Sequence, residues 1–220
     1  MEEQEFIIKI NKIEQITHDV KKLICDKPEG YNFVPGQATE VGVNKKDWQD
    51  RKRPFTFSNL PNEDSLEFVI KIYPDHEGVT NEIDKLVEGD EFVIGEPWGV
   101  IHYSGEGVFI AGGAGVTPFI SILRDLSKKG ELGNNILLFS NKTSEDIILK
   151  EEFREMLGDK AIFNLTELEG KRIDINYIKE KLGDLEGKKF YICGPKEMVK
   201  DVRESLIGEG ISEEYLVFEK

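Results

Sequence analysis

The chain has 220 residues, 39% hydrophobic and 33% charged, which suits one large globular domain or two small ones. Its 29 Lys and Arg against 43 Asp and Glu give a net charge of −14, a field that repels phosphate backbones and disfavours nucleic acid as a partner. No run approaches the roughly 20 apolar residues that a membrane span needs, and the first residues lack the basic and apolar regions of a signal peptide. We therefore expect a cytoplasmic protein without a membrane span.

The potential metal ligands are few and scattered. Cys25 and Cys193 are the two cysteines, and two thiols are too few for a structural zinc or for most iron–sulfur clusters. The three histidines, His18, His76 and His102, show no ligand spacing. We predict no metal site, and two cysteines fit a reduced cytoplasmic protein better than a disulfide framework.

The first half of the chain has the pattern of an antiparallel β-barrel. Its short apolar runs partly alternate, are rich in β-branched and aromatic residues, and are separated by Pro, Gly and Asn. One helix is expected among them, at 79–87. Six strands at this spacing predict a small barrel; they are expected at 6–13, 20–25, 38–43, 55–58, 66–73 and 91–94.

After residue 104 the pattern changes to strands alternating with helices, which predicts a doubly wound α/β domain with a parallel sheet. We place the domains at 1–104 and 105–220. The strands are expected at 108–111, 136–140, 161–165, 190–193 and 215–218. The helices are expected at 118–129, 147–157, 174–182 and 195–207.

The second domain begins with a glycine loop between its first strand and first helix. Gly112, Gly113 and Gly115 let a backbone approach a ligand closely, Thr117 can cap free amides, and Pro118 suits the first helical turn. A helix N-terminus of this kind suits a pyrophosphate. The loop departs from GxGxxG, because Pro118 stands at the third glycine. A tight strand-to-helix turn without a ligand is the alternative interpretation.

A second loop follows a later strand of the same domain. Cys193, Gly194 and Pro195 come at its carboxyl end, the sheet edge at which ligands bind in α/β domains. The Cys193 thiol would then face the same crevice as the glycine loop. The alternative is that Cys193 is a small buried apolar residue.

In the barrel, one strand combines a guanidinium, aromatic rings and hydroxyls. Alternation predicts Arg53, Phe55 and Phe57 on one face and Thr56 and Ser58 on the other. Arginine is a bidentate partner for phosphate, and a flat ring can stack on a flavin. An exposed arginine on an ordinary strand is the alternative.

The barrel's one expected helix starts at Gly78, Val79 and Thr80, a further candidate for a pyrophosphate. This helix start, the Arg53 strand and the two loops of the second domain make four features. Their order, over nearly the whole chain, resembles that in the ferredoxin–NADP reductase family. The resemblance is greatest to compact flavodoxin or ferredoxin reductases and to reductase modules of bacterial oxygenases without an iron–sulfur domain. It is carried by Phe33-Val-Pro-Gly-Gln37, Arg53-Pro-Phe-Thr56, Gly78-Val-Thr80, Gly95-Glu-Pro-Trp-Gly99, Gly112-Gly-Ala-Gly-Val-Thr-Pro118 and Cys193-Gly-Pro195 with Met198.

The resemblance implies FAD and NAD(P)H as cofactors and assigns roles at the flavin. Arg53 would bind the flavin phosphates, Phe55 would stack on the isoalloxazine, and the Thr56 hydroxyl would bond flavin N5, with Ser58 next to it. Relatives usually carry Tyr where this chain has Phe55. The segment Gly78-Val79-Thr80 would hold the pyrophosphate, which favours FAD over FMN.

At the nicotinamide nucleotide, the resemblance implies that the pyrophosphate is bound by Gly112, Gly113, Gly115, Thr117 and Pro118. Cys193, Gly194 and Pro195 would lie near the nicotinamide. Ala114 replaces a hydroxylated residue common in that loop. Glu219 stands where many relatives have a glutamate followed by an aromatic ring, and this sequence has no such ring. The resemblance implies that Glu219 relays protons; the alternative is a solvated carboxylate.

The sequence as a whole predicts an FAD-dependent NAD(P)H oxidoreductase. It would pass electrons to an external acceptor: a flavodoxin, a ferredoxin, an oxygenase component or a small molecule. A free-flavin or quinone reductase, and a non-catalytic FAD-binding electron-transfer subunit, remain the alternatives. Ser140 and Lys142 could accept a 2′-phosphate and so favour NADPH, or Lys142 is a solvated loop residue. Lys45, Lys46, Arg51 and Lys52 around Trp48 form a candidate docking patch, or a solvated charged loop.

Overall fold

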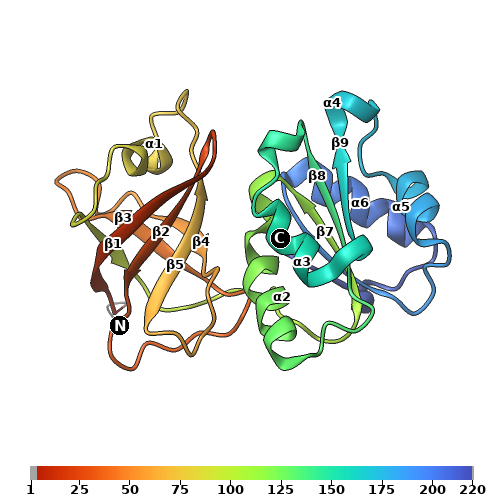
Figure 1. Ribbon diagram of the computed structural model, residues 1–220, viewed down its shortest axis with the longest axis horizontal. Coiled ribbons are helices and arrows are strands. Elements are labelled where there is room, and N and C mark those ends of the chain that lie inside the picture. Colours follow the sequence, from red (N-terminus) through yellow and green to blue (C-terminus); the bar gives the residue numbers. More distant parts are fainter. Residues whose placement is uncertain (1–3, 220) are drawn as a thin grey trace. The chain divides into compact units, whose positions relative to one another are not determined.

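The computed structural model describes residues 4–219, which divide into two compact units. The first unit runs to Gly99 and includes Thr117–Ile122, and the second contains Val100–Val116 and the chain from Leu123 onward. Figure 1 shows a unit of antiparallel strands followed along the chain by a unit of strands and helices. This is the predicted fold class, a β-barrel followed by an α/β domain.

The first unit is a six-stranded antiparallel sheet in the order β4-β3-β6-β1-β2-β5. An isolated bridge between Phe57 and Phe68 joins β4 to β5, the two ends of that order, and so draws the sheet toward closure. One helix, α1 (Val79–Asp84), belongs to this unit. The strands are β1 (Phe6–Thr17), β2 (Val20–Asp26), β3 (Ala38–Val43), β4 (Arg53–Thr56), β5 (Ser65–Lys71) and β6 (Glu91–Ile94).

Aromatic rings fill the centre of the barrel. Phe33 stacks on Phe57 with 4.3 Å between ring centroids, and Phe57, Phe68 and Phe92 follow one another at 5.4 and 6.4 Å. In β1, Ile8 and Ile10 are buried while Ile7 and Lys9 are exposed, the alternation of a strand with one face on a core. Phe57 is fully buried, so this core holds β4 at its carboxyl end.

The second unit is a five-stranded, all-parallel sheet in the order β11-β10-β7-β8-β9. Its core strands are continuous apolar runs, as expected for strands covered on both faces. The strands are β7 (Gly107–Gly112), β8 (Ile136–Asn141), β9 (Ala161–Leu165), β10 (Lys189–Cys193) and β11 (Leu216–Phe218).

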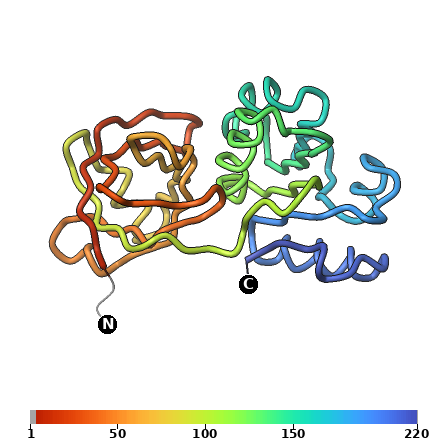
Figure 2. The backbone as a smooth tube through the Cα atoms, turned by 90° about the horizontal axis from the view of Figure 1, so that it is seen from below, coloured from red at the N-terminus to blue at the C-terminus, as the bar shows by residue number. Residues whose placement is uncertain are grey.

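Helices cover both faces of this sheet. In Figure 2, α2 and α3 lie on one face and α5 and α6 on the other. Phe153 of α3 packs edge-on against Phe139 of β8, while Ile178 and Val202, of α5 and α6, share a core with the strands. The helices are α2 (Thr117–Lys129), α3 (Lys150–Leu157), α4 (Thr166–Glu169), α5 (Ile175–Leu182) and α6 (Lys196–Gly208).

Several elements differ from the sequence prediction. Strand β1 continues to Thr17 instead of ending at residue 13, and α1 ends at Asp84 instead of residue 87. The strand expected at 55–58 lies at Arg53–Thr56, because Phe57 and Ser58 turn into the core and pair with the β5 region. Helix α3 starts at Lys150, since Leu149 adopts a left-handed conformation with φ 51°. Helix α4 was not predicted.

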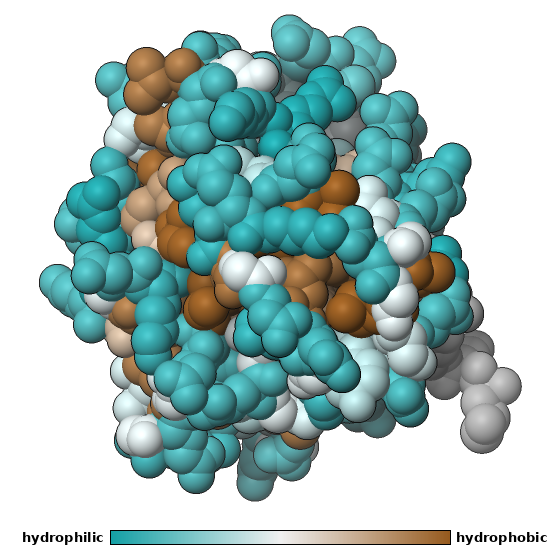
Figure 3. All heavy atoms as spheres, turned by 90° about the vertical axis from the view of Figure 1, so that its right-hand side faces the viewer, coloured by the Kyte–Doolittle hydropathy of each residue, from teal (hydrophilic) through white to brown (hydrophobic). Residues whose placement is uncertain are grey.

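The face shown in Figure 3 is mostly hydrophilic, with apolar side chains visible between polar ones. The described part of the chain contains no helix that could span a membrane.

Candidate cofactor sites

The first candidate site is strand β4 of the barrel. Arg53 is exposed, and its Nη1 donates a hydrogen bond to the backbone oxygen of Lys52 at 2.8 Å, while its guanidinium pairs with no carboxylate among residues 4–219. Phe55 is half-buried and packs at the border of the barrel core. The Thr56 hydroxyl bonds no described residue. This strand therefore offers a phosphate donor, a partly open ring and an unused hydroxyl in sequence.

Ser58 has a different position from the one its predicted role requires. It is fully buried, and its hydroxyl bonds the Glu67 backbone oxygen at 3.1 Å and the Glu67 carboxylate at 2.8 Å. A side chain without exposed surface cannot touch a cofactor, so the assignment of Ser58 to cofactor binding is corrected. The hydroxyl instead ties the end of β4 to β5.

The second candidate feature in the barrel is the start of α1. Its N-cap is Gly78, which makes no side-chain capping bond, and the space that a Cβ on Gly78 would occupy is open. Val79 points into the barrel core, so its backbone amide alone can face a ligand. The Thr80 hydroxyl bonds nothing in the described chain. The donor set of amides and a hydroxyl fits a phosphate group.

In the sheet unit, the glycine loop Gly112–Val116 leaves the carboxyl end of β7 and enters α2. A Cβ on Gly112 would lie 2.6 Å from the Met198 sulfur and 3.0 Å from Pro195 Cδ. A Cβ on Gly115 would lie 2.4 Å from the Cys193 backbone oxygen. These two glycines are therefore required by the close approach of the Cys193–Met198 segment, whereas the sequence reasoning attributed them to a ligand.

Gly113 is the glycine of this loop that faces open space. Its φ is +51°, and nothing lies within 4 Å of the Cβ position. The helix begins differently from the prediction, since its N-cap is Val116, without a side-chain capping bond, and Thr117 is its first residue, with Pro118 next. The N-cap position expected for Thr117 is therefore corrected to Val116, and Thr117 is a buried residue of the first helical turn.

Cys193 and Glu219 lie at the same edge of the sheet. Strands β10 and β11 are parallel with Ile192 opposite Phe218, so the next residue of each strand is Cys193 and Glu219, respectively. Burial, together with the negative charge of Glu219, raises the pKa of the Cys193 thiol to about 12. Loss of water also raises the pKa of Glu219. Cys193 is thus a neutral thiol at physiological pH.

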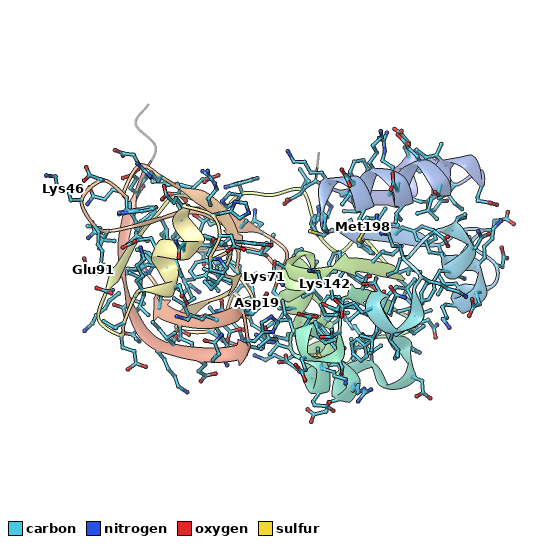
Figure 4. The ribbon with its side chains drawn as sticks, turned by 90° about the horizontal axis from the view of Figure 1, so that it is seen from above. Asp19, Lys46, Lys71, Glu91, Lys142 and Met198 are labelled. Atoms are coloured by element: carbon cyan, nitrogen blue, oxygen red, sulfur yellow. The ribbon has the colours of Figure 1, made fainter. Side chains whose placement is uncertain are left out.

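The end of β8 holds the residues predicted to select the nucleotide. Ser140 donates a hydrogen bond to Asn164 Oδ1 at 3.0 Å, and Lys142, labelled in Figure 4, is exposed with its ammonium bonded to no described group. Sequence reasoning missed Asn141 between them. Its side chain is 6% exposed, and neither Oδ1 nor Nδ2 has a partner in the described part of the chain. A polar residue at the carboxyl end of a buried strand was the available signal.

The structure defines a class of protein with an antiparallel barrel followed by a parallel α/β sheet, and comparisons with known proteins identify both units. Residues 7–103 match the family model for an oxidoreductase FAD-binding domain, and residues 109–204 match that for an oxidoreductase NAD-binding domain. The chain belongs to the ferredoxin–NADP reductase family. The predicted family, fold and cofactor classes are confirmed.

Individual relatives are distant. The chain is 25% identical, over 99% of its length, to the reductase component of propane 2-monooxygenase from Rhodococcus jostii. It is 24% identical, over 93%, to the ferredoxin–NAD(P)(+) reductase component of the naphthalene 1,2-dioxygenase system from Pseudomonas putida. It spans 64% and 65% of those two relatives, respectively. A crystal structure of ferredoxin NADP+ reductase from Neisseria gonorrhoeae with bound FAD and NADP matches with TM-score 0.85, 22% identity and 99% coverage of both chains.

Proposed function

We propose that this protein oxidises NAD(P)H with a bound FAD and passes the electrons to a separate acceptor. Bound FAD would supply the redox chemistry, taking a hydride from the nicotinamide and releasing electrons. One observation carries the proposal. The same chain has a barrel strand whose Arg53 guanidinium pairs with no carboxylate among residues 4–219, and a sheet whose glycine loop is open at Gly113. We assign the flavin domain to 1–104 and the nucleotide domain to 105–220.

In the barrel, the chain's own groups bind and orient. Arg53 would hold the flavin phosphates, and the first amides of α1, with Thr80, would hold the pyrophosphate. Phe55 would support the flavin ring. The Thr56 hydroxyl would donate a hydrogen bond to the flavin, and such a bond gains strength as negative charge develops.

In the sheet unit, the backbone of Gly113 and the start of α2 hold the dinucleotide pyrophosphate, supported by Gly112 and Gly115. Cys193 would lie near the nicotinamide as a neutral thiol, with Gly194 and Pro195 forming the loop beside it. Glu219 would relay protons at this edge of the sheet. Its raised pKa supports that role, because a carboxyl with a pKa nearer neutrality exchanges protons more readily at physiological pH.

We propose NADPH as the preferred nucleotide. The ammonium of Lys142 is free to pair with a 2′-phosphate, and Ser140 and Asn141 lie on the same strand end. An acidic side chain at this position would favour NADH, and Glu145 is the first one after β8 begins.

We propose that the acceptor lies outside these 220 residues, because their two cysteines are too few to ligate an iron–sulfur cluster. We propose a small acidic electron carrier or oxygenase component, docking on the loop around Trp48. Arg51 stacks over the Trp48 ring at 4.9 Å, Lys45 pairs with Asp90 at 3.4 Å, and Lys52 pairs with Glu5. Lys46 is exposed and extends away from the barrel in Figure 4. The two free thiols support a cytoplasmic location.

Anaerobic titration tests this function. The protein, reconstituted with FAD, is mixed with NADPH or NADH, and the flavin absorbance is followed. Bleaching identifies a reductase, and subsequent addition of ferricyanide restores the colour. A yellow protein that does not bleach with either nucleotide is a passive flavin carrier, and a protein that takes up no flavin contradicts the whole proposal.

A further inference from the structure

The last strand of the sheet is too short to hold its own position well. Strand β11 has three residues, lies at the edge and pairs with β10 alone. Few backbone hydrogen bonds therefore fix it, and strand ends of this kind fray unless side chains hold them. Because Glu219 follows β11 directly, whatever fixes this strand also fixes that carboxylate.

Arg203 of α6 contacts the chain at both ends of β11. Its Nη2 donates a hydrogen bond to Glu213 Oε1 at 2.5 Å, in the short helical turn Glu213–Tyr215 that precedes the strand. Its guanidinium carbon lies 5.0 Å from the ring centre of Phe218, the last residue of the strand, within cation–π distance. The Arg203 Nε is buried without a hydrogen-bond partner in the described structure. The side chain thus makes its contacts to Glu213 and Phe218 although its Nε donor has no hydrogen-bond partner among the described residues.

The two contacts lead to the Cys193–Glu219 pair. Phe218 lies opposite Ile192 in the register of the two strands, so Cys193 and Glu219 are the residues that follow this last pair. Burial raises the pKa of the Cys193 thiol, and among the described residues the charge of Glu219 raises it further. The alkylation rate of the Cys193 thiol therefore depends on where the Glu219 carboxylate lies.

We propose that Arg203 is a positioning residue that holds Glu219 beside Cys193 by clamping β11 at Glu213 and Phe218. Arg203 itself touches neither cofactor nor reacting atoms. We call the two contacts of Arg203, to Glu213 and to Phe218, the clamp. Only one consequence rests on the proposed function: that the clamp controls proton exchange at this edge of the sheet. The clamp itself can be measured without any nucleotide.

The same sheet provides a matched control at its other edge. Arg154 of α3 stacks over Phe163 of the edge strand β9 at 5.5 Å and pairs with Glu151 at 3.5 Å. Arg154→Leu removes the same kind of contact from an edge strand that carries neither Cys193 nor Glu219. The two variants remove equal charge, and both introduce a good helix former.

The first measurement is the rate of iodoacetamide alkylation of Cys193 at pH 9 in the full chain, with the site identified by peptide mass spectrometry. The rate follows the thiolate fraction. We expect Glu219→Gln and Arg203→Leu each to raise it about threefold or more, the effect of a pKa lowered by about half a unit. We expect the double variant to match Glu219→Gln alone and Arg154→Leu to match wild type. Circular dichroism confirms that each variant is folded.

Two further variants separate the contacts. Glu213→Gln removes the ion pair and leaves the ring contact, whereas Arg203→Lys keeps the charge and loses the planar stack. If the stack on Phe218 transmits the effect, Arg203→Lys behaves as Arg203→Leu, and Glu213→Gln stays closer to wild type. An Arg203→Leu rate unchanged from wild type overturns the proposal. So does an equal increase by Arg203→Leu in the wild-type and Glu219→Gln backgrounds, since this shows general loosening around Cys193.

The consequence for the reaction is tested on the FAD-loaded protein by the pH profile of flavin reduction. Arg203→Leu should reproduce the profile of Glu219→Gln, while Arg154→Leu keeps that of wild type. A wild-type protein that NAD(P)H does not reduce contradicts the proposed function and leaves the thiol measurement intact. A profile of Arg203→Leu identical to that of wild type, together with unchanged alkylation, contradicts the clamp.

Discussion

The two candidate cofactor sites use different parts of the chain. In the barrel the proposed binding groups are side chains, because Arg53 and Thr56 stand on a strand with a guanidinium and a hydroxyl that have few partners among the described residues. In the sheet unit the proposed binding groups are backbone, and two of the glycines of the loop are required by the close approach of a second loop. Gly112 packs against Met198 and Pro195, and Gly115 packs against the Cys193 carbonyl. The comparison teaches that glycines in such a loop can be required by a neighbouring protein segment and not by a ligand.

The strongest test of this difference is an added methyl group in the glycine loop. Gly115→Ala places its Cβ against the backbone of Cys193, which cannot move without shifting β10, so we expect a loss of about 3 kcal/mol in the free energy of unfolding. Nucleotide binding should be lost with it. Gly113→Ala, in open space at φ +51°, should cost about 1 kcal/mol. Urea unfolding and calorimetric binding of NADP+ measure both, and equal losses would contradict the packing explanation.

In the barrel, the corresponding test is removal of a side chain. Arg53→Ala deletes the charged donors proposed for the flavin phosphates, and we expect FAD affinity to fall about 100-fold with little change in stability. Arg51→Ala is the matched control, because it removes the same charge two residues away, where the guanidinium stacks on Trp48. Flavin content after gel filtration is the measurement. A full complement of FAD in Arg53→Ala would show that another group binds the phosphates.

A smaller effect is expected at the Thr56 hydroxyl. Thr56→Val keeps the shape and removes the proposed donor, so FAD should stay bound while its reduction by NADPH slows about tenfold. Ser58→Ala serves as control: its hydroxyl is bonded to Glu67, and its loss should lower stability without changing the reduction rate. Stopped-flow bleaching measures the rate, and wild-type speed in Thr56→Val would remove this hydroxyl from the mechanism.

Nucleotide preference sharpens the comparison on the sheet side. Lys142→Ala should raise the KM for NADPH about fivefold and leave that for NADH unchanged, because a 2′-phosphate loses one screened ion pair. Lys150→Ala is the control, since that ammonium bonds Ser144 at 2.7 Å in the same loop region. A lower KM for NADH in the wild-type protein, unaffected by Lys142→Ala, would reverse the proposed preference.

The least severe change is expected at the surface. Lys45→Glu with Lys46→Glu should slow reduction of an acidic carrier protein a few-fold and weaken its salt dependence, while reduction of ferricyanide changes little. Equal loss with both acceptors would indicate a damaged flavin site. No loss with either would remove the loop around Trp48 from the docking surface.

The sequence was sufficient to predict the architecture, because the spacing of apolar residues and the positions of Gly, Pro and Asn are local properties of the chain. It was insufficient wherever a second segment decides the outcome. Ser58 reads as an exposed hydroxyl on an alternating strand, but Glu67 and the aromatic core draw it inward. The glycines read as ligand contacts, yet Met198 and Cys193, some 80 residues later, require two of them. Arg203 gives no local signal that its Nε is buried without a partner among the described residues, whereas Asn141 could have been found from its place at the end of a buried strand.

The central claim is that this chain moves a hydride from a nicotinamide to its own flavin, and anaerobic stopped-flow reduction tests it most directly. With FAD-loaded protein in excess NADPH, we predict that the oxidised flavin absorbance disappears in a phase whose rate saturates with NADPH concentration. The Gly115→Ala protein, mixed with the same NADPH, should keep its flavin oxidised. A wild-type protein that binds FAD and NADPH yet shows no loss of flavin absorbance would contradict the account.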